Sequence, residues 1–224
     1  TNSSFALWGT ILSVVFSCLG TVFLQYVFFV KLRELSVQDC IALACFSSVL
    51  FVSGTLAYML GLGLAVILGP LATMFTTAVD YLFRYPLLIT VLFISPRVGS
   101  YALFATTTWL LSAFSTGSLG LMDLLFLTSR IFLFESMLYI TGITRHQRWK
   151  KHSQTQQRIR FAIALSIGGF LYGAIGMALH ISLYRLYYAD WYIAMMLLGP
   201  GFLYIVCATW IGIPFAHSIS KVLR

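Results

Sequence analysis

The stretch Arg145-His-Gln-Arg-Trp-Lys-Lys-His-Ser-Gln-Thr-Gln-Gln-Arg-Ile-Arg160 separates two long apolar runs and decides the topology of the chain. It holds six Lys/Arg residues and no acidic residue. Membrane proteins keep such positive loops in the cytoplasm, so this loop is predicted to be cytoplasmic. Binding of nucleic acid or anionic lipid is the competing interpretation of a basic cluster. A topology signal is the preferred interpretation, and no nucleic-acid partner is predicted.

The composition points to the lipid bilayer as the solvent of this chain. Its 224 residues are 60% hydrophobic and 9% charged, with a net charge of +8 and a mean hydropathy of +0.93. Soluble domains carry roughly 25% charged residues. Since this chain cannot cover its surface with polar groups, a single all-α transmembrane domain over residues 1–224 is predicted.

Seven apolar runs are each near the roughly 20 residues that a helix needs to cross a membrane. The gaps between them alternate between basic and uncharged, which predicts a bundle of about seven transmembrane helices with the N-terminus outside and the C-terminus in the cytoplasm. A gap is expected around Gly61 and Gly63, and a helix break is expected between Arg84 and Pro86. The runs are 5–30, 37–60, 62–83, 99–114, 119–143, 161–184 and 192–215.

Small residues in the sixth run predict close helix packing. Gly169 and Gly173 form a GxxxG pattern, and Gly176 extends the same face by another turn. Such stripes let helix backbones approach one another in membranes. Packing inside the chain is the commoner case, and docking of a partner subunit is the alternative.

Ionisable residues inside the runs are the main functional signal, because charges in a membrane face a cavity or a counter-charge. Asp39 is expected to mark a helix start. Asp80 and Arg84 lie one turn apart and are expected to form a local ion pair.

The fifth run contains a charged constellation of its own. Asp123 and Arg130 share one helix face, whereas Glu135 is rotated by about 140° from Arg130 on an ideal helix. Two interpretations stay open: a buried ion pair that locks helices together, or a polar ligand site.

Enzyme signatures are absent from the sequence: it has no HExxH, GxSxG, P-loop or GxGxxG motif. We therefore expect no catalytic activity, no metal and no cofactor. His180 and His217 are widely separated and offer only a minor alternative, a haem- or pigment-binding subunit.

The second half of the chain carries a recognisable arrangement of short motifs. Ser95-Pro96-Arg97-Val98-Gly99-Ser100 opens one run, a Ser/Gly turn follows at 115–120, and the next run carries Glu135 within Phe134-Glu135-Ser136. The basic loop, a Gly-rich run and the terminal segment 212–224 follow. Residues 95–224 thus resemble the substrate-binding (S) component of an energy-coupling factor (ECF) vitamin transporter, in its thiamine-precursor branch.

This resemblance implies a subunit that captures a vitamin or vitamin precursor from the outer side and works with cytoplasmic ATPases and a coupling membrane subunit. It also implies the plasma membrane of a prokaryote. The candidate substrate-binding residues are Arg130, Glu135 and Asp123 for polar contacts, and Trp109, Tyr172 and Tyr187 for stacking on a flat ligand.

The basic loop is the expected place for a cytoplasmic partner, through Arg148, Lys150 and Lys151. The alternative function is a non-enzymatic structural or accessory subunit of a larger membrane complex, with the GxxxG stripe and the aromatic-rich surfaces as its docking faces.

Overall fold

The computed structural model describes residues 2–31, 36–116, 120–145, 152–183, 185, 186 and 188–222, and every regular element in these ranges is a helix. The prediction of an all-α helical bundle is therefore confirmed. The elements are α1 (Asn2–Tyr26), η1 (Val27–Lys31), α2 (Val37–Leu68), η3 (Gly69–Leu71), α3 (Ala72–Ile94), α4 (Ser100–Thr116), α5 (Leu121–Ile140), α6 (Gln154–Leu183), α7 (Asp190–Leu198), η5 (Gly199–Leu203) and α8 (Tyr204–Val222).

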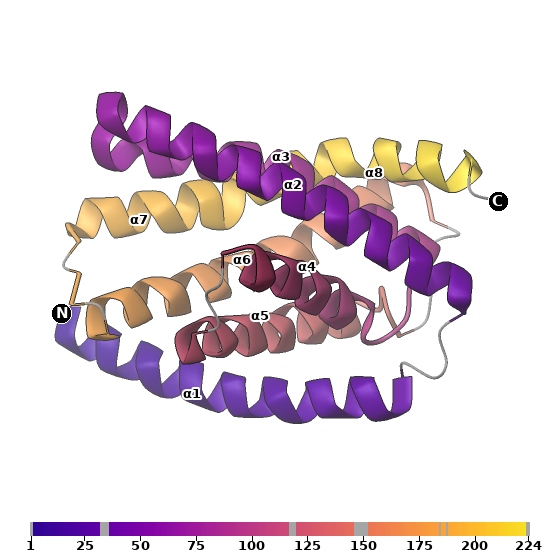
Figure 1. Ribbon diagram of the computed structural model, residues 1–224, viewed down its shortest axis with the longest axis horizontal. Coiled ribbons are helices and arrows are strands. Elements are labelled where there is room, and N and C mark those ends of the chain that lie inside the picture. The colour runs from indigo at the N-terminus through magenta and orange to yellow at the C-terminus, as the bar shows by residue number, and fades with distance from the viewer. Residues whose placement is uncertain are drawn as a thin grey trace.

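The helices form two groups with α4 between them (Figure 1). Helices α1, α5 and α6 pack together on one side, and on the other side α3 packs against both α2 and α8. We name the two ends of the bundle by their connections. The hairpin end carries η3, which joins α2 to α3, and the loop end carries the end of α5 and the start of α6, between which the basic segment lies in the sequence (Figure 1).

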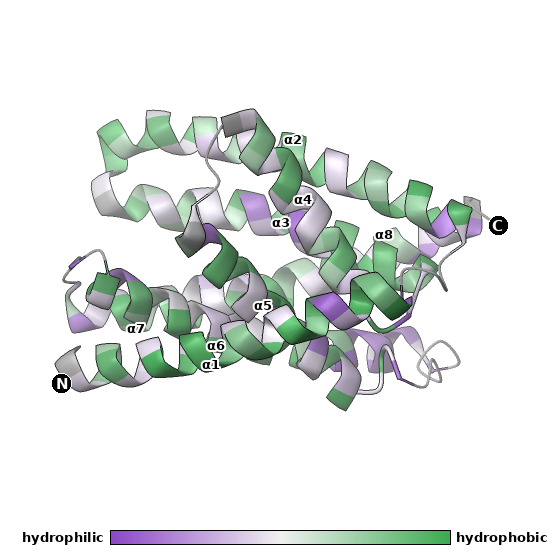
Figure 2. Ribbon diagram, turned by 60° about the horizontal axis from the view of Figure 1, so that its bottom comes forward, coloured by the Kyte–Doolittle hydropathy of each residue, from purple (hydrophilic) through white to green (hydrophobic). Residues whose placement is uncertain are grey.

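Five helical segments are long and apolar enough to cross a membrane, which supports an integral membrane protein. They are 4–31, 37–68, 72–94, 154–183 and 190–221, so α7, η5 and α8 count as one segment. Helix α4 has only 17 residues, and α5 carries three charged residues among its 20. Figure 2 shows hydrophobic residues along all the helices and hydrophilic residues at the two ends and in the middle of α3.

The expected gap around Gly61 and Gly63 is wrong. Helix α2 continues through both residues to Leu68, and the chain turns only at Gly69, which has a φ of +54° and is followed by Pro70. A positive φ favours glycine, and the residue before a proline avoids the helical region. A Cβ on Gly61 would contact the Thr76 side chain of α3 at 2.6 Å, so this glycine allows α2 and α3 to approach closely.

The expected break between Arg84 and Pro86 is also wrong, because α3 runs through Pro86 to Ile94. Membrane helices tolerate an internal proline when neighbouring groups satisfy the freed backbone. Here Pro86 is buried, and its Cα lies 3.0 Å from where a Cβ on Gly212 of α8 would stand. Tight packing of α3 on α8 thus accompanies a continuous helix.

The glycine stripe of α6 packs inside the chain. A Cβ on Gly169 would overlap Ile205 of α8 and lie 3.2 Å from the Gly201 carbonyl oxygen, and one on Gly173 would lie 3.4 Å from Leu197. Gly176 instead faces α5, where its Cβ would lie 3.9 Å from Phe126. The face formed by Gly169 and Gly173 is therefore occupied within the protein.

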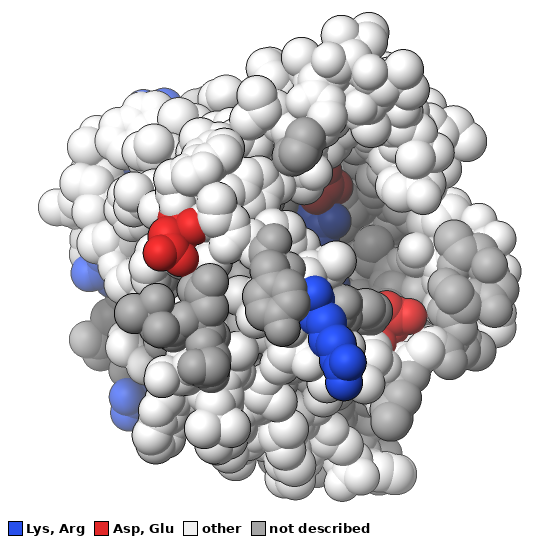
Figure 3. All heavy atoms as spheres, turned by 90° about the vertical axis from the view of Figure 1, so that its left-hand side faces the viewer, with Lys and Arg blue, Asp and Glu red and all other residues white. Residues whose placement is uncertain are grey.

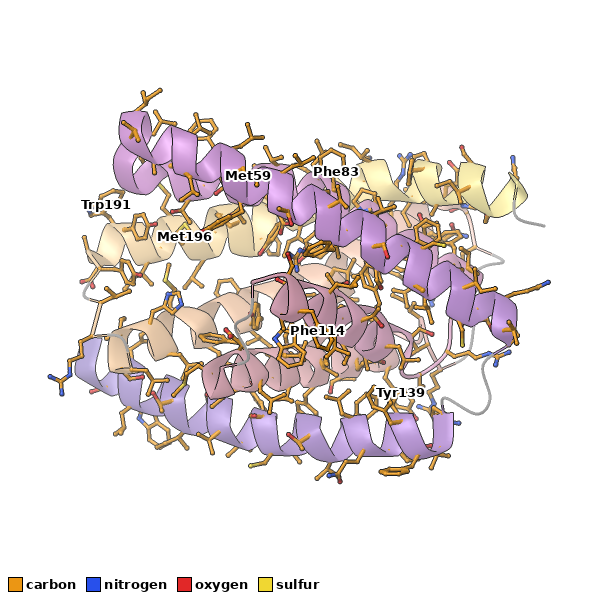
Figure 4. The ribbon with its side chains drawn as sticks, in the orientation of Figure 1. Met59, Phe83, Phe114, Tyr139, Trp191 and Met196 are labelled. Carbon is orange, nitrogen blue, oxygen red and sulfur yellow. The ribbon has the colours of Figure 1, made fainter. Side chains whose placement is uncertain are left out.

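Fully buried side chains concentrate toward the loop end, whereas large apolar side chains cover the outside (Figure 4). The outward residues labelled there include Met59 on α2, Phe83 on α3 and Trp191 on α7, which are exposed. An apolar exterior suits a lipid environment. The core contains Leu88, Ile89, Leu92, Ile131, Leu138, Phe161, Leu165 and Ile213.

Candidate ligand site in the helical bundle

A cavity of about 560 Å³ lies toward the hairpin end, between α2, α3, the end of α4 and the start of α5. Its cause is the difference in helix length. Helix α4 stops at Thr116 after 17 residues, whereas α2 extends over 32 residues. Figure 3 shows the molecule from this end as a hollowed surface, with acidic and basic side chains in its depth.

The cavity has a polar wall inside an otherwise apolar bundle. Hydroxyl groups reach it from α2, α3 and α4, and two carboxylates and one guanidinium complete the lining. Polar groups at membrane depth are stable where they line a cavity. The polar lining residues are Thr55, Tyr58, Thr76, Thr77, Asp80, Arg84, Thr108, Ser112, Ser115 and Asp123, with Trp109 beside them.

Asp80 and Arg84 form the predicted ion pair in this wall. Arg84 donates through both Nε and Nη2 to the same oxygen, Asp80 Oδ2, at 2.8 Å each. The other oxygen, Asp80 Oδ1, is buried and has no hydrogen-bond partner among the described residues. A buried carboxylate oxygen without a donor is costly, so a donor on a bound molecule would be stabilised there.

A second and narrower space of about 40 Å³, here called the narrow extension, adjoins the cavity on the side of the bundle interior. Leu50, Arg84 and Thr108 line both spaces, which makes them neighbours. The extension is lined by four tyrosines and two arginines and by no carboxylate: Tyr81, Tyr85, Tyr101, Tyr172, Arg84 and Arg130. The rings of Tyr81 and Tyr85 meet edge to face, with centroids 5.0 Å apart.

Arg130 is the charged group of this narrow extension. Its guanidinium carbon lies 5.9 Å from the centroid of the Tyr172 ring, in the geometry of a cation–π contact. Its Nε is buried and has no hydrogen-bond partner within the described part of the chain. Neither Asp123 nor Glu135, the acidic residues of its own helix, lines the extension.

The structure brings four of the predicted site residues to these two adjoining spaces. Asp123 and Trp109 line the wide cavity, and Arg130 and Tyr172 line the narrow extension. Tyr187, the remaining stacking candidate, lies outside the described residues.

Glu135 is placed elsewhere. Its carboxylate is buried, with 4% of the residue exposed, and Oε1 accepts hydrogen bonds from the backbone N–H groups of Gly99 at 3.1 Å and Ala102 at 3.0 Å. It thereby satisfies free donors at the start of α4. Glu135 also lines a separate groove of about 380 Å³ with mostly apolar neighbours. Its observed contacts are those of a helix cap, away from the ligand cavity.

Asp39 occupies the structural role expected of it. It forms a capping box at the start of α2, in which Asp39 N donates to Ser36 Oγ at 3.1 Å and Ser36 N donates to Asp39 Oδ2 at 3.3 Å. The pair lies at the loop end, far along α2 from the residues that line the cavity.

The two histidines have separate environments. The His180 ring packs edge-on against Phe126 with centroids 5.8 Å apart, whereas His217 lies 2.8 Å from Gln157 Oε1 and packs against Phe93. Across the described residues, no group of three or more His, Cys, Asp or Glu side chains is placed to hold a metal ion. The loop residues Arg148, Lys150 and Lys151 lie outside the described ranges.

Sequence reasoning missed the three tyrosines Tyr81, Tyr85 and Tyr101. A local signal did exist for two of them, because Tyr81, Arg84 and Tyr85 follow the i, i+3, i+4 spacing of one helix face. Tyr101 had no such signal, since its position depends on how α4 packs against the other helices.

No protein-family model matches this chain, and neither the curated proteins nor the solved structures contain a match. The resemblance of residues 95–224 to ECF substrate-binding components therefore stays a prediction.

Proposed function

We propose that this protein is a membrane-embedded subunit that captures a small polar molecule in the cavity between α2, α3, α4 and α5. The observation that carries the proposal is the Asp80–Arg84 pair in the wall of a cavity of about 560 Å³, with Asp80 Oδ1 buried and unpartnered. Ligand pockets typically measure about 300–1,000 Å³ and combine apolar walls with a few placed polar groups.

The distribution of charge supports a binding role for this wall. Asp80 and Arg84 lie one turn apart on α3, so their ion pair does not join two helices. The Asp80 and Arg84 side chains are 17% and 30% exposed, and they face an open cavity. Ionisable residues in such positions mark ligand or ion pathways in membrane proteins.

The proposed orientation puts the mouth of the cavity on the outer side. The basic loop belongs to the cytoplasmic side by its charge, and the cavity lies toward the opposite, hairpin end. With α7, η5 and α8 as one pass and with α4 and α5 also crossing, the chain makes seven passes, from an outer N-terminus to a cytoplasmic C-terminus. The ligand then enters from outside the cell.

Uptake of a vitamin or vitamin precursor, driven by ATPases that dock through a coupling subunit, is the form of this function that the ECF resemblance implies. In that scheme the protein resides in a prokaryotic plasma membrane, and Arg148, Lys150 and Lys151 contact the partner. Co-purification of an ATPase, lost on neutralising these three residues together, tests this part separately.

One observation speaks against the alternative function as a structural subunit. The alternative relied in part on the glycine stripe of α6 as a docking face, but Gly169 and Gly173 already pack against Ile205 and Leu197 of the same chain.

Native mass spectrometry of the purified full chain tests the capture function. We expect a small molecule to co-purify with the wild-type protein and to be lost from the Asp80→Asn variant. Asp39→Asn is the matched control, since Asp39 caps α2 at the loop end and should leave the ligand in place. An empty wild-type protein, or equal occupancy in Asp80→Asn, would contradict the proposal.

A further inference from the structure

The narrow extension of the cavity has an unbalanced positive charge. Arg84 and Arg130 both line it, but Arg84 is already neutralised by the ion pair with Asp80. No carboxylate lines the extension, so the charge of Arg130 is left over. A protein interior tolerates a charge only when it is paired or hydrogen-bonded, and a bound anion would supply that pairing.

The acidic residues nearest in sequence to Arg130 are engaged elsewhere. Glu135 Oε1 accepts the backbone N–H groups at the start of α4, and Asp123 lines the wide cavity toward the hairpin end. The Nε of Arg130 is buried and unpartnered within the described residues, and its observed close neighbour is the face of the Tyr172 ring. A cation–π contact leaves the in-plane N–H donors of a guanidinium free to bind an acceptor.

We propose that the ligand is a small organic anion whose carboxylate binds Arg130 in the narrow extension while its body fills the wide cavity. This inference rests on the proposed capture function. A guanidinium binds a carboxylate through two parallel N–H···O hydrogen bonds, and the surrounding tyrosine hydroxyls are further donors. Hydroxyl or amino groups at the far end of the ligand donate to Asp80 Oδ1 and Asp123, which line the wide part.

The volumes of the two spaces determine which end of the ligand lies in each of them. A single water needs roughly 10–15 Å³ of such volume, so the extension of about 40 Å³ holds a group of a few heavy atoms but no ring. The wide part, at about 560 Å³, holds a ring with its substituents. Trp109 in its wall offers a surface on which a flat ring can stack.

Paired carboxylate and amide probes test the inference on the full chain in phosphatidylcholine nanodiscs. The probes are benzoate with benzamide and nicotinate with nicotinamide, with binding read from tryptophan fluorescence and from the unfolding temperature. We expect each carboxylate to bind about 10- to 100-fold more tightly than its amide, because a hydrogen bond to a charged group is lost in the amide. Equal affinities for the acid and its amide would overturn the proposal. It would also be overturned if chloride displaced bound benzoate completely in a competition titration, because the site would then recognise any anion and not a carboxylate.

Variants of Arg130 provide the second arm. Arg130→Gln should remove the preference for acid over amide, Arg130→Lys should retain a reduced preference, and Arg145→Gln, an exposed residue at the loop end, should leave it unchanged. If Arg130→Gln does not fold, the preference for acid over amide is compared between the wild-type protein and Arg130→Lys, and an equal preference in the two proteins refutes the assignment. An unchanged preference in Arg130→Gln refutes the assignment.

Native mass spectrometry separates the two levels of the proposal. A co-purified ligand without a carboxylate refutes the anion assignment and leaves the capture function standing. A protein that carries no ligand and binds none of the four probes refutes both.

Discussion

The cap that Glu135 provides for α4 leads to a quantitative prediction for two substitutions at one position. Glu135→Ala removes the acceptor of the Gly99 and Ala102 N–H groups, which are 3.1 and 3.0 Å from Oε1. Ala102 is fully buried. A buried donor left without a partner costs about 1–3 kcal/mol, so the loss of both hydrogen bonds should lower the free energy of unfolding by about 2–6 kcal/mol.

Glu135→Gln is the matched variant, because its amide oxygen can accept the same two hydrogen bonds. Only the interaction of the charge with the positive end of the α4 dipole is lost, and this interaction is worth about 0.3–1 kcal/mol. The two variants should therefore differ by at least about 1 kcal/mol in the free energy of unfolding.

Unfolding in mixed micelles of increasing SDS content, followed by tryptophan fluorescence, measures this difference, since Trp109 lies on α4 itself. A Glu135→Gln variant as unstable as Glu135→Ala would show that charge, and not the acceptor geometry, determines the contribution. A Glu135→Ala variant of wild-type stability would refute the cap.

Three further substitutions test the packing and the ion pair. Gly169→Val should lower the free energy of unfolding by about 2 kcal/mol in the same SDS titration, because overpacking a tight contact costs about 1–3 kcal/mol. Gly63→Ala is the control: no atom lies within 4 Å of its added Cβ, so it should not destabilise α2. Gly99→Ala should cost about 1–2 kcal/mol in that assay, because Gly99 has a φ of +96°; wild-type stability would mean that the turn can change its conformation. Benzoate carries no hydrogen-bond donor for Asp80 Oδ1, so it does not depend on Asp80 in the way the co-purified ligand is proposed to. Because Asp80→Asn frees Arg84 from its counter-charge, this variant should bind benzoate more tightly in a fluorescence titration even though it releases the larger ligand, and weaker binding of benzoate would contradict the assigned charge balance.

Local features of this protein could be predicted from its sequence. The Asp80–Arg84 pair and the helix-start role of Asp39 depend on spacings of four and three residues within one helix, and both predictions are confirmed. The all-helical architecture followed from composition and from the apolar runs. These features need no knowledge of how distant segments meet.

The features that failed depend on contacts between helices. Gly61 and Pro86 resemble helix interruptions, but in the structure they pack against Thr76 and Gly212 of neighbouring helices, and the helices continue. Burial of the surrounding helix outweighs the roughly 1–3 kcal/mol by which such residues disfavour a helix interior.

The candidate site shows the same division. Arg130 and Glu135 are five residues apart and looked equally suited to hold a ligand. The packing of α4 gives the two residues different roles. Backbone N–H groups at the start of α4 donate to Glu135, whereas Tyr101 of α4 lines the narrow extension together with Arg130. The sequence of α5 contains no information on where α4 starts, so it could not assign these roles.

The length of α2 has a consequence for the membrane around the protein. Its 32 residues span about 48 Å, whereas the hydrocarbon core of a bilayer is about 30 Å thick. The helix remains apolar to its last turn, where Val66 and Ile67 are 88% and 79% exposed. A hydrophobic segment longer than the bilayer tilts or thickens the lipid around it. Residues 50–58 of the same helix line the cavity, so a change in the tilt of α2 with bilayer thickness would move one wall of the proposed binding site.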